Sequence, residues 1–264
     1  GRAGSAGFFP GQWAALPVRD PKEGIDFVKR NKSVGEEAFN NRLDILNRLN
    51  TDFQEDFGTR DSQSYMDTYS GSLKFMNSKD IDAFELQSVT PSISKLYDAS
   101  KFSRSCLLAG RLVERGDRFV KVNLGGWDYH DAIYDKLPAN AKSLDNGLSS
   151  LLTRLSQKGL LDSTLVVVST EFGRKPEVNP NAGRDHHPDG FTCLMAGAGV
   201  KAGQVYGKTT QDGKHAEEEI LDVTDFNASI AWRLGIDPNF EESSASGRPF
   251  KLANRGKARM ELFS

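Results

Sequence analysis

The chain has 264 residues and a mass of 29.1 kDa, and its 34 basic and 36 acidic side chains give a formal net charge of −2. The isoelectric point of about 6.2 argues against a protein that binds nucleic acid through bulk positive charge, for which a value above about 9 is typical. Two cysteines, Cys106 and Cys193, leave room for one disulfide bridge but exclude a disulfide scaffold and a thiolate zinc site. No apolar run approaches the roughly 20 residues of a membrane span.

The first hundred or so residues are predicted to be mainly helical. Apolar side chains recur at helical spacing over residues 35–56, 66–76 and 107–113, and each stretch predicts an amphipathic helix. Ser33 and Glu36 have the spacing of a capping box in front of the first of these helices. We find no strong strand pattern in this part of the sequence.

The pattern changes in the second half of the chain, where three apolar segments predict strands over residues 119–124, 164–168 and 191–196. The continuous apolar run of the second segment is typical of a strand that is covered on both faces. A helix over 144–155 separates the first two strands, and a last helix covers 225–235. This order predicts an α/β fold with a largely parallel sheet.

Three polar clusters follow or precede these strands, at residues 125–130, 169–174 and 183–188. Ligands of such sheets bind beyond the carboxyl ends of the strands, so we expect the three clusters to meet there. They contain three of the four histidines, and each cluster offers a carboxylate. Imidazole and carboxylate together bind zinc, manganese or iron without sulfur. The candidate metal ligands are Asp128, His130, Glu171, Asp185, His186 and His187.

Two arginines in these clusters, Arg174 and Arg184, are candidates for binding an anionic substrate, because guanidinium matches the oxygens of phosphate and sulfate. A divalent ion beside them could polarise an ester oxygen or activate water. Simpler interpretations stay open. Glu171 could pair with either arginine, and the histidine clusters could form a metal-free hydrogen-bond network that holds long loops in place.

The clusters, in this order, resemble a bacterial family called domain of unknown function 1501. Residues 122–130 resemble its glycine-rich segment with Trp-Asp-x-His, and residues 159–174 resemble its central strand with the polar stretch that follows. Residues 183–186 and 247–249 complete the set, and the resemblance is strongest over 107–252. The family is related to sulfatases within the alkaline phosphatase superfamily.

The resemblance implies an alkaline-phosphatase-like α/β/α sandwich with a largely parallel sheet, a helical first half and an N-terminal part that is missing from this chain. Residues 1–264 would form a single domain, in which 1–115 is a mainly helical outer layer or insertion and 116–264 is the sheet core with the site. Members of the family are usually exported, commonly with a twin-arginine signal. A periplasmic or secreted location is therefore expected.

In the wider superfamily, two metal ions flank a Ser, Thr or formylglycine nucleophile near the N-terminus. Asp128, His130 and His186 match the ligands of one ion in this resemblance. The second ion uses an Asp-His pair after a central strand, and Glu171-Phe172 occupies that place here. Phenylalanine cannot ligate a metal, so the second site is expected to be degraded or differently built. The catalytic nucleophile is not identified.

We therefore expect an exported sulfatase- or phosphatase-like protein, namely a metal-dependent hydrolase of sulfate or phosphate esters. The cofactor would be zinc, calcium, magnesium or manganese, and the expected partner is an anionic ester or a sulfated polysaccharide. No nucleic acid partner and no membrane span are expected, and the sequence does not indicate the oligomeric state. The alternative is a non-catalytic binding or scaffold protein that keeps the fold with a degraded metal site.

Overall fold

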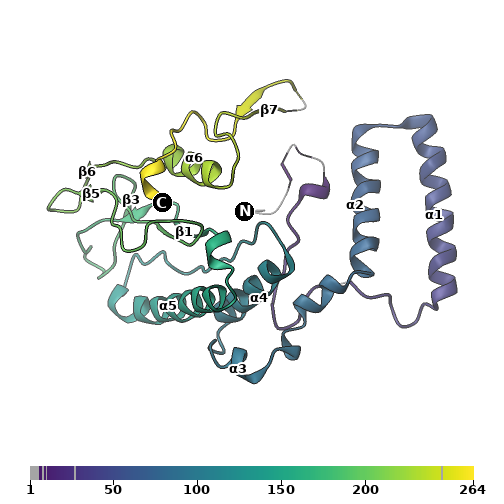
Figure 1. The fold of residues 1–264 in the computed structure, drawn as a ribbon, viewed down its shortest axis with the longest axis horizontal. Coiled ribbons are helices and arrows are strands. Elements are labelled where there is room, and N and C mark those ends of the chain that lie inside the picture. Colours follow the sequence, from purple (N-terminus) through teal and green to yellow (C-terminus); the bar gives the residue numbers. More distant parts are fainter. Residues whose placement is uncertain (1–5, 8, 10, 27, 245) are drawn as a thin grey trace. The chain divides into compact units, whose positions relative to one another are not determined.

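The computed structural model describes residues 6–264 except residues 8, 10, 27 and 245 (Figure 1). The chain forms two compact units, Gly1–Ser94 and Lys95–Ser264. The helices are α1 (Glu36–Phe57), α2 (Arg60–Met76), α3 (Pro91–Ser94), α4 (Lys101–Arg115), α5 (Ile133–Gln157) and α6 (Val223–Arg233). The expected single domain over residues 1–264 stays a prediction.

Every strand among the described residues lies in the second unit. The strands are β1 (Val166–Val168), β2 (Gly173–Arg174), β3 (His186–His187), β4 (Leu194–Ala196), β5 (Lys208–Thr209), β6 (Ala216–Glu218), β7 (Glu241–Ser243) and β8 (Pro249–Lys251). They form four antiparallel pairs, β1 with β4, β2 with β3, β5 with β6 and β7 with β8.

These pairings show that the predicted α/β/α sandwich with a largely parallel sheet is wrong. Residues 119–124 form no strand among the described residues, and Phe119 is exposed. Of the predicted strand over 191–196, only Leu194–Ala196 pairs, and it runs antiparallel to Val166–Val168. An apolar run favours extended backbone, but it does not specify the direction or the number of the hydrogen-bonded neighbours.

The first unit confirms the predicted helix over 35–56 as α1, which runs antiparallel to α2 (Figure 1). The capping box predicted in front of α1 is wrong. The N-cap residue is Gly35, which has no side chain that could cap the helix, and the Ser33 hydroxyl donates to the side chain of Asn31. A capping box does occur at the start of α2, between Thr59 and Ser62.

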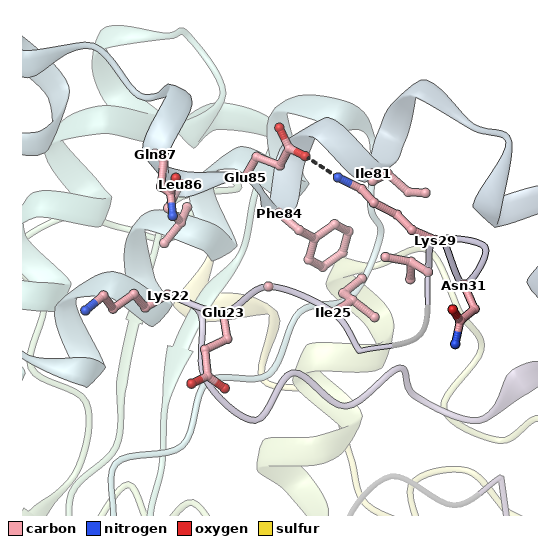
Figure 2. Close-up of a pocket in the computed structure, with 12 residues that line it drawn as sticks. Lys22, Glu23, Ile25, Lys29, Asn31, Ile81, Phe84, Glu85, Leu86 and Gln87 are labelled. Carbon is pink, nitrogen blue, oxygen red and sulfur yellow. Dashed lines mark hydrogen bonds and ion pairs between the residues drawn. The ribbon is translucent and has the colours of Figure 1, made fainter. Parts of the chain in front are cut away.

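A shallow hollow of about 560 Å³ lies in the first unit between residues 22–31 and 81–87 (Figure 2). Ile25, Ile81 and Phe84 contribute apolar walls, and Lys29 Nζ donates to an oxygen of Glu85 at 3.0 Å. Its described lining residues include no histidine or cysteine. The hollow therefore lacks the imidazole and thiolate ligands of a transition-metal site.

The core of the second unit begins where α4 packs against α5. A Cβ atom on Gly147 would lie 2.7 Å from the ring of Phe102, so glycine permits the close approach of the two helices. Burial raises the pKa of the Cys106 thiol in this contact to about 12, and both cysteines are free. The most buried residues of these helices are Ser103, Cys106, Leu107, Leu108, Ala109, Arg154 and Leu155.

Two polar interactions join the start and the end of α4 to α5. The buried Arg154 Nε donates to Glu114 at 2.6 Å. Burial alone raises the pKa of Glu114, but the hydrogen bond and charge of Arg154 outweigh it, so the pKa is lowered. Asp98 accepts hydrogen bonds from the Ser100 amide and the Asn146 side chain. Hydrogen bonding from the side chains of Ser100 and Asn146 holds the pKa of Asp98 well below the usual range.

Helix α6 anchors the C-terminal segment of the second unit. Asp222 caps the helix by accepting from the amide of Asp225. The Asp225 carboxylate in turn accepts from Arg259 at 2.7 Å and from the amide of Lys257 at 2.8 Å.

None of the helices among the described residues is both long and apolar enough to cross a membrane.

Candidate metal centre

Two loops of the second unit carry the candidate metal ligands. Asp128 and His130 lie in the loop over residues 125–132, directly before α5. His186 lies on β3, where its backbone pairs with Arg174 of β2. The two clusters are more than 40 residues apart in sequence, so their meeting depends on the contacts that join the loops.

Backbone hydrogen bonds join these loops directly. The amide of Arg184 donates to the carbonyl of Tyr129 at 2.9 Å. The amide of Ile133, at the start of α5, donates to the carbonyl of Ala182 at 2.8 Å. The second bond satisfies a donor at the N-terminus of α5, which lacks a partner within the helix, and the two bonds together fix the loops to each other.

Gly183 sits where the two loops approach most closely. A Cβ atom at this position would lie 2.0 Å from the carbonyl carbon of His130 and 2.4 Å from the amide nitrogen of Asp131. Both are backbone atoms, so they cannot move aside as a flexible side chain could. The geometry of the centre therefore requires glycine at this position.

Asp128, His130 and His186 place three ligand atoms in one small triangle. Asp128 Oδ1 lies 2.9 Å from His186 Nε2 and 3.1 Å from His130 Nε2. The two Nε2 atoms lie 3.2 Å apart. Tetrahedral ligands at zinc distances of 2.0–2.1 Å are separated by about 3.3–3.4 Å. The triangle is only slightly smaller, so it fits a single cation.

The far nitrogen of His130 is held by a second set of groups. Its Nδ1 lies 3.1 Å from Asp185 Oδ1, and Asn179 Nδ2 donates to the same carboxylate oxygen at 3.2 Å and to the His130 carbonyl at 3.1 Å. An ionised carboxylate only accepts, so the proton of the neutral ring belongs on Nδ1. The lone pair of Nε2 then faces Asp128 and His186. Metal-binding histidines commonly have such a carboxylate partner.

Arg174 sets the electrostatics of the triangle. Its Nη2 donates to Asp128 Oδ1, and its Nη1 donates to the carbonyl of Arg184 at 3.1 Å. The hydrogen bond from Arg174 and then that from His186 lower the pKa of Asp128 to about 2. Asp128 is therefore ionised near neutral pH, as a metal ligand must be.

Phe172 packs against the centre instead of ligating it. Its ring centroid lies 4.3 Å from that of His186, with an angle of 38° between the planes. The guanidinium of Arg174 lies 5.8 Å from the centroid of the same phenyl ring. Phe172 thus restricts the orientations of the His186 ring.

The structure does not bring all the sequence candidates together. Glu171 is exposed and lies outside the triangle. His187 is buried, and its Nε2 donates to the carbonyl of Lys214 at 2.7 Å. The Arg184 side chain donates to the carbonyl of Lys175 at 3.2 Å, which leaves Arg174 as the guanidinium in contact with the ligands.

The sequence alone did not predict the roles of three residues in the centre. These are Phe172, which packs against His186, and the loop residues Asn179 and Gly183. Asn179 stands before a proline, and an Asn-Pro pair marks a turn, so a signal for an ordered loop was present. The role of Gly183 depends on an approach between distant backbones, which no local pattern encodes.

Comparison with known proteins identifies the family of the chain. The family model described as "Protein of unknown function (DUF1501)" matches residues 1–263, so the chain belongs to this family. No curated protein and no solved structure matches the chain.

Proposed function

We propose that this member of the DUF1501 family binds one divalent cation through Asp128, His130 and His186 and hydrolyses sulfate or phosphate esters there. The observation that carries the proposal is the triangle of ligand atoms, whose sides measure 2.9, 3.1 and 3.2 Å. Its support by Asp185 adds the outer partner that metal-binding histidines use.

The donor set favours zinc, with manganese as the next choice. Calcium takes six to eight oxygen ligands and magnesium keeps mainly oxygen ligands, whereas this triangle offers two imidazole nitrogens and one carboxylate oxygen. Three protein ligands with exposed side chains leave a position open to water and substrate, which is the arrangement of catalytic zinc sites.

The side chains around the triangle suit an anionic ester. A bound cation would supply Lewis acidity toward an ester oxygen. Arg174 lies beside Asp128, and its guanidinium could orient an oxygen of the sulfate or phosphate group. Asp185 and Phe172 hold the two imidazole rings in place.

The sulfatase relationship, a sulfated polysaccharide as substrate and export to the periplasm or the medium belong to the same proposal. They rest on the resemblance of the Trp127–His130 and Gly183–His186 motifs to a sulfatase-related family. The geometry of the triangle supports metal binding more directly than it supports any one substrate.

Metal binding can be tested on the purified chain. We expect isothermal titration with Zn²⁺ to give one equivalent, and His186→Ala to abolish it. His215→Ala is the matched control, because His215 is an exposed histidine outside the triangle, and this variant should bind normally. Absence of Zn²⁺ and Mn²⁺ binding by the wild-type chain, with both variants indistinguishable from it, would refute the metal centre.

Hydrolysis is tested separately with p-nitrophenyl sulfate and p-nitrophenyl phosphate, using the Zn²⁺-loaded chain. We expect turnover of at least one ester, and its loss in Asp128→Asn. A non-catalytic binding protein is the second candidate, because no Ser, Thr or Cys side chain hydrogen-bonds to the ligands among the described residues. Stoichiometric Zn²⁺ binding without turnover of either ester would favour that candidate.

A further inference from the structure

Helix α1 is 22 residues long and has no buried residue. Most helical stability in proteins comes from the packing of an apolar face and not from intrinsic propensity. Four large apolar side chains of α1 are between 53% and 63% exposed, namely Ile45, Leu49, Phe53 and Phe57. Among the described residues, this face is left mostly exposed, although its composition favours a packing partner.

Three of these side chains form an apolar row, defined here as Ile45, Leu49 and Phe53. They are spaced by four residues, so they lie along one side of the helix. The row continues to Arg42, three residues before it, and to Asp56, three residues after it, and both charged residues are exposed. The row is thus apolar in the middle, positive at one end and negative at the other.

The sequence of this row is complementary to itself when reversed. If two copies of α1 pack antiparallel with Leu49 on a two-fold axis, Ile45 of one copy lies opposite Phe53 of the other. Arg42 then lies opposite Asp56 at both ends, since each is seven residues from Leu49. A parallel arrangement would place Arg42 against its own copy and Asp56 against its own copy, which is repulsive.

We propose that the apolar row of α1 is an interface between two copies of this chain, packed antiparallel about a two-fold axis at Leu49. Closed two-fold dimers are the commonest soluble assemblies, and they require such a self-complementary patch. The two ion pairs span about 21 Å along the helix, from residue 42 to residue 56, and they fix both the direction and the register of the pairing.

The mass of the chain in solution tests the interface. We expect sedimentation velocity to show a dimer, and Leu49→Asp to show a monomer with unchanged far-UV circular dichroism, because Leu49 is exposed in a single copy. Asn47→Asp is the matched control, since it adds the same charge on the opposite side of α1, and it should remain dimeric. A monomeric wild-type chain, or a dimer that survives Leu49→Asp, overturns the proposal.

The direction and register are tested by charge reversal and by crosslinking. Arg42→Glu and Asp56→Arg should each weaken the dimer at least tenfold, and the double variant should restore it, because the opposite charges meet again. Leu49→Cys should form an intermolecular disulfide under mild oxidation, whereas Asn47→Cys and the wild-type chain should not. Failure of the double variant to recover, or equal crosslinking of both cysteine variants, overturns the antiparallel pairing.

Discussion

His130 Nδ1 lies 3.1 Å from Asp185 Oδ1, and this hydrogen bond turns the other nitrogen of the ring toward Asp128 and His186. The same carboxylate oxygen accepts from Asn179, so the position of Asp185 is itself held by the loop. Asp185 thereby changes from a candidate ligand into a group that orients one.

This relationship predicts the effect of Asp185→Ala. The imidazole of His130 loses the partner that fixes its proton and its orientation, so affinity for Zn²⁺ should fall about 10–100-fold while the stoichiometry stays at one. Isothermal titration measures both quantities. Asp189→Ala is the control, because Asp189 is an exposed carboxylate outside the triangle, 3.9 Å from His215. Equal affinity in the two variants would contradict the orienting role.

Gly183→Ala should disturb the centre through the backbone. The new methyl group would meet the backbone of His130 and Asp131, which must shift, and overpacking of this kind costs about 1–3 kcal/mol. We expect a lower melting temperature and weaker Zn²⁺ binding. Gly125→Ala is the control, since a Cβ atom there has no neighbour within 4 Å. If Gly183→Ala proves as stable as Gly125→Ala, the described approach of the loops is incorrect.

Glu114→Ala should destabilise the contact between α4 and α5 strongly. The Arg154 side chain is 5% exposed and would keep its charge without its partner, which costs about 3–5 kcal/mol. Urea unfolding measures the loss. Glu218→Ala provides the comparison, because it breaks an exposed ion pair with Lys208, and such pairs contribute at most about 1 kcal/mol. A similar loss of unfolding free energy in both variants would show that the buried ion pair stabilises the chain no more than the exposed one.

Asp98 should make the free energy of unfolding of the second unit depend on pH in the acid range. Hydrogen bonds from Ser100 and Asn146 lower its pKa in the folded chain, so below about pH 4 the unfolded chain binds more protons at this residue than the folded chain does. This contribution is present above the unfolded pKa and is lost as the pH falls toward the folded pKa. The free energy of unfolding should therefore fall less steeply with acid in Asp98→Asn than in the wild-type chain. Urea unfolding between pH 5 and pH 2 measures both slopes, and parallel slopes would contradict this account.

The helices could be predicted from the sequence because their signals are local. Apolar spacing marked α1, and Gly116 in the left-handed conformation ends α4 as a C-terminal glycine should. The sheet could not be predicted in the same way. The valines of residues 166–168 do form a strand, but their partner Leu194–Ala196 runs antiparallel, and only contacts between distant segments decide that direction.

The candidate site was predictable by residue type but not by role. By residue type, Asp128, His130 and His186 are three of six candidate ligands, and only the family resemblance groups these three around one ion, without giving the roles of the other three. The contrast between His186 and His187 has a simple cause, because neighbouring side chains of a strand point to opposite faces. On β3 one imidazole therefore reaches Asp128, while the next is buried and donates to the Lys214 carbonyl.

The shortness of β2 and β3, two residues each, has a consequence for the centre. The β2–β3 pair therefore has little regular hydrogen bonding of its own, and a few separate backbone bonds hold its loop to the loop of Asp128 and His130, so local opening should cost far less free energy than global unfolding. A cation ligated from both loops binds only when they are together, and it would act as a crosslink between them. The backbone amides of Arg184 and Ile133 would then report occupancy, since their hydrogen exchange slows when the loops are closed.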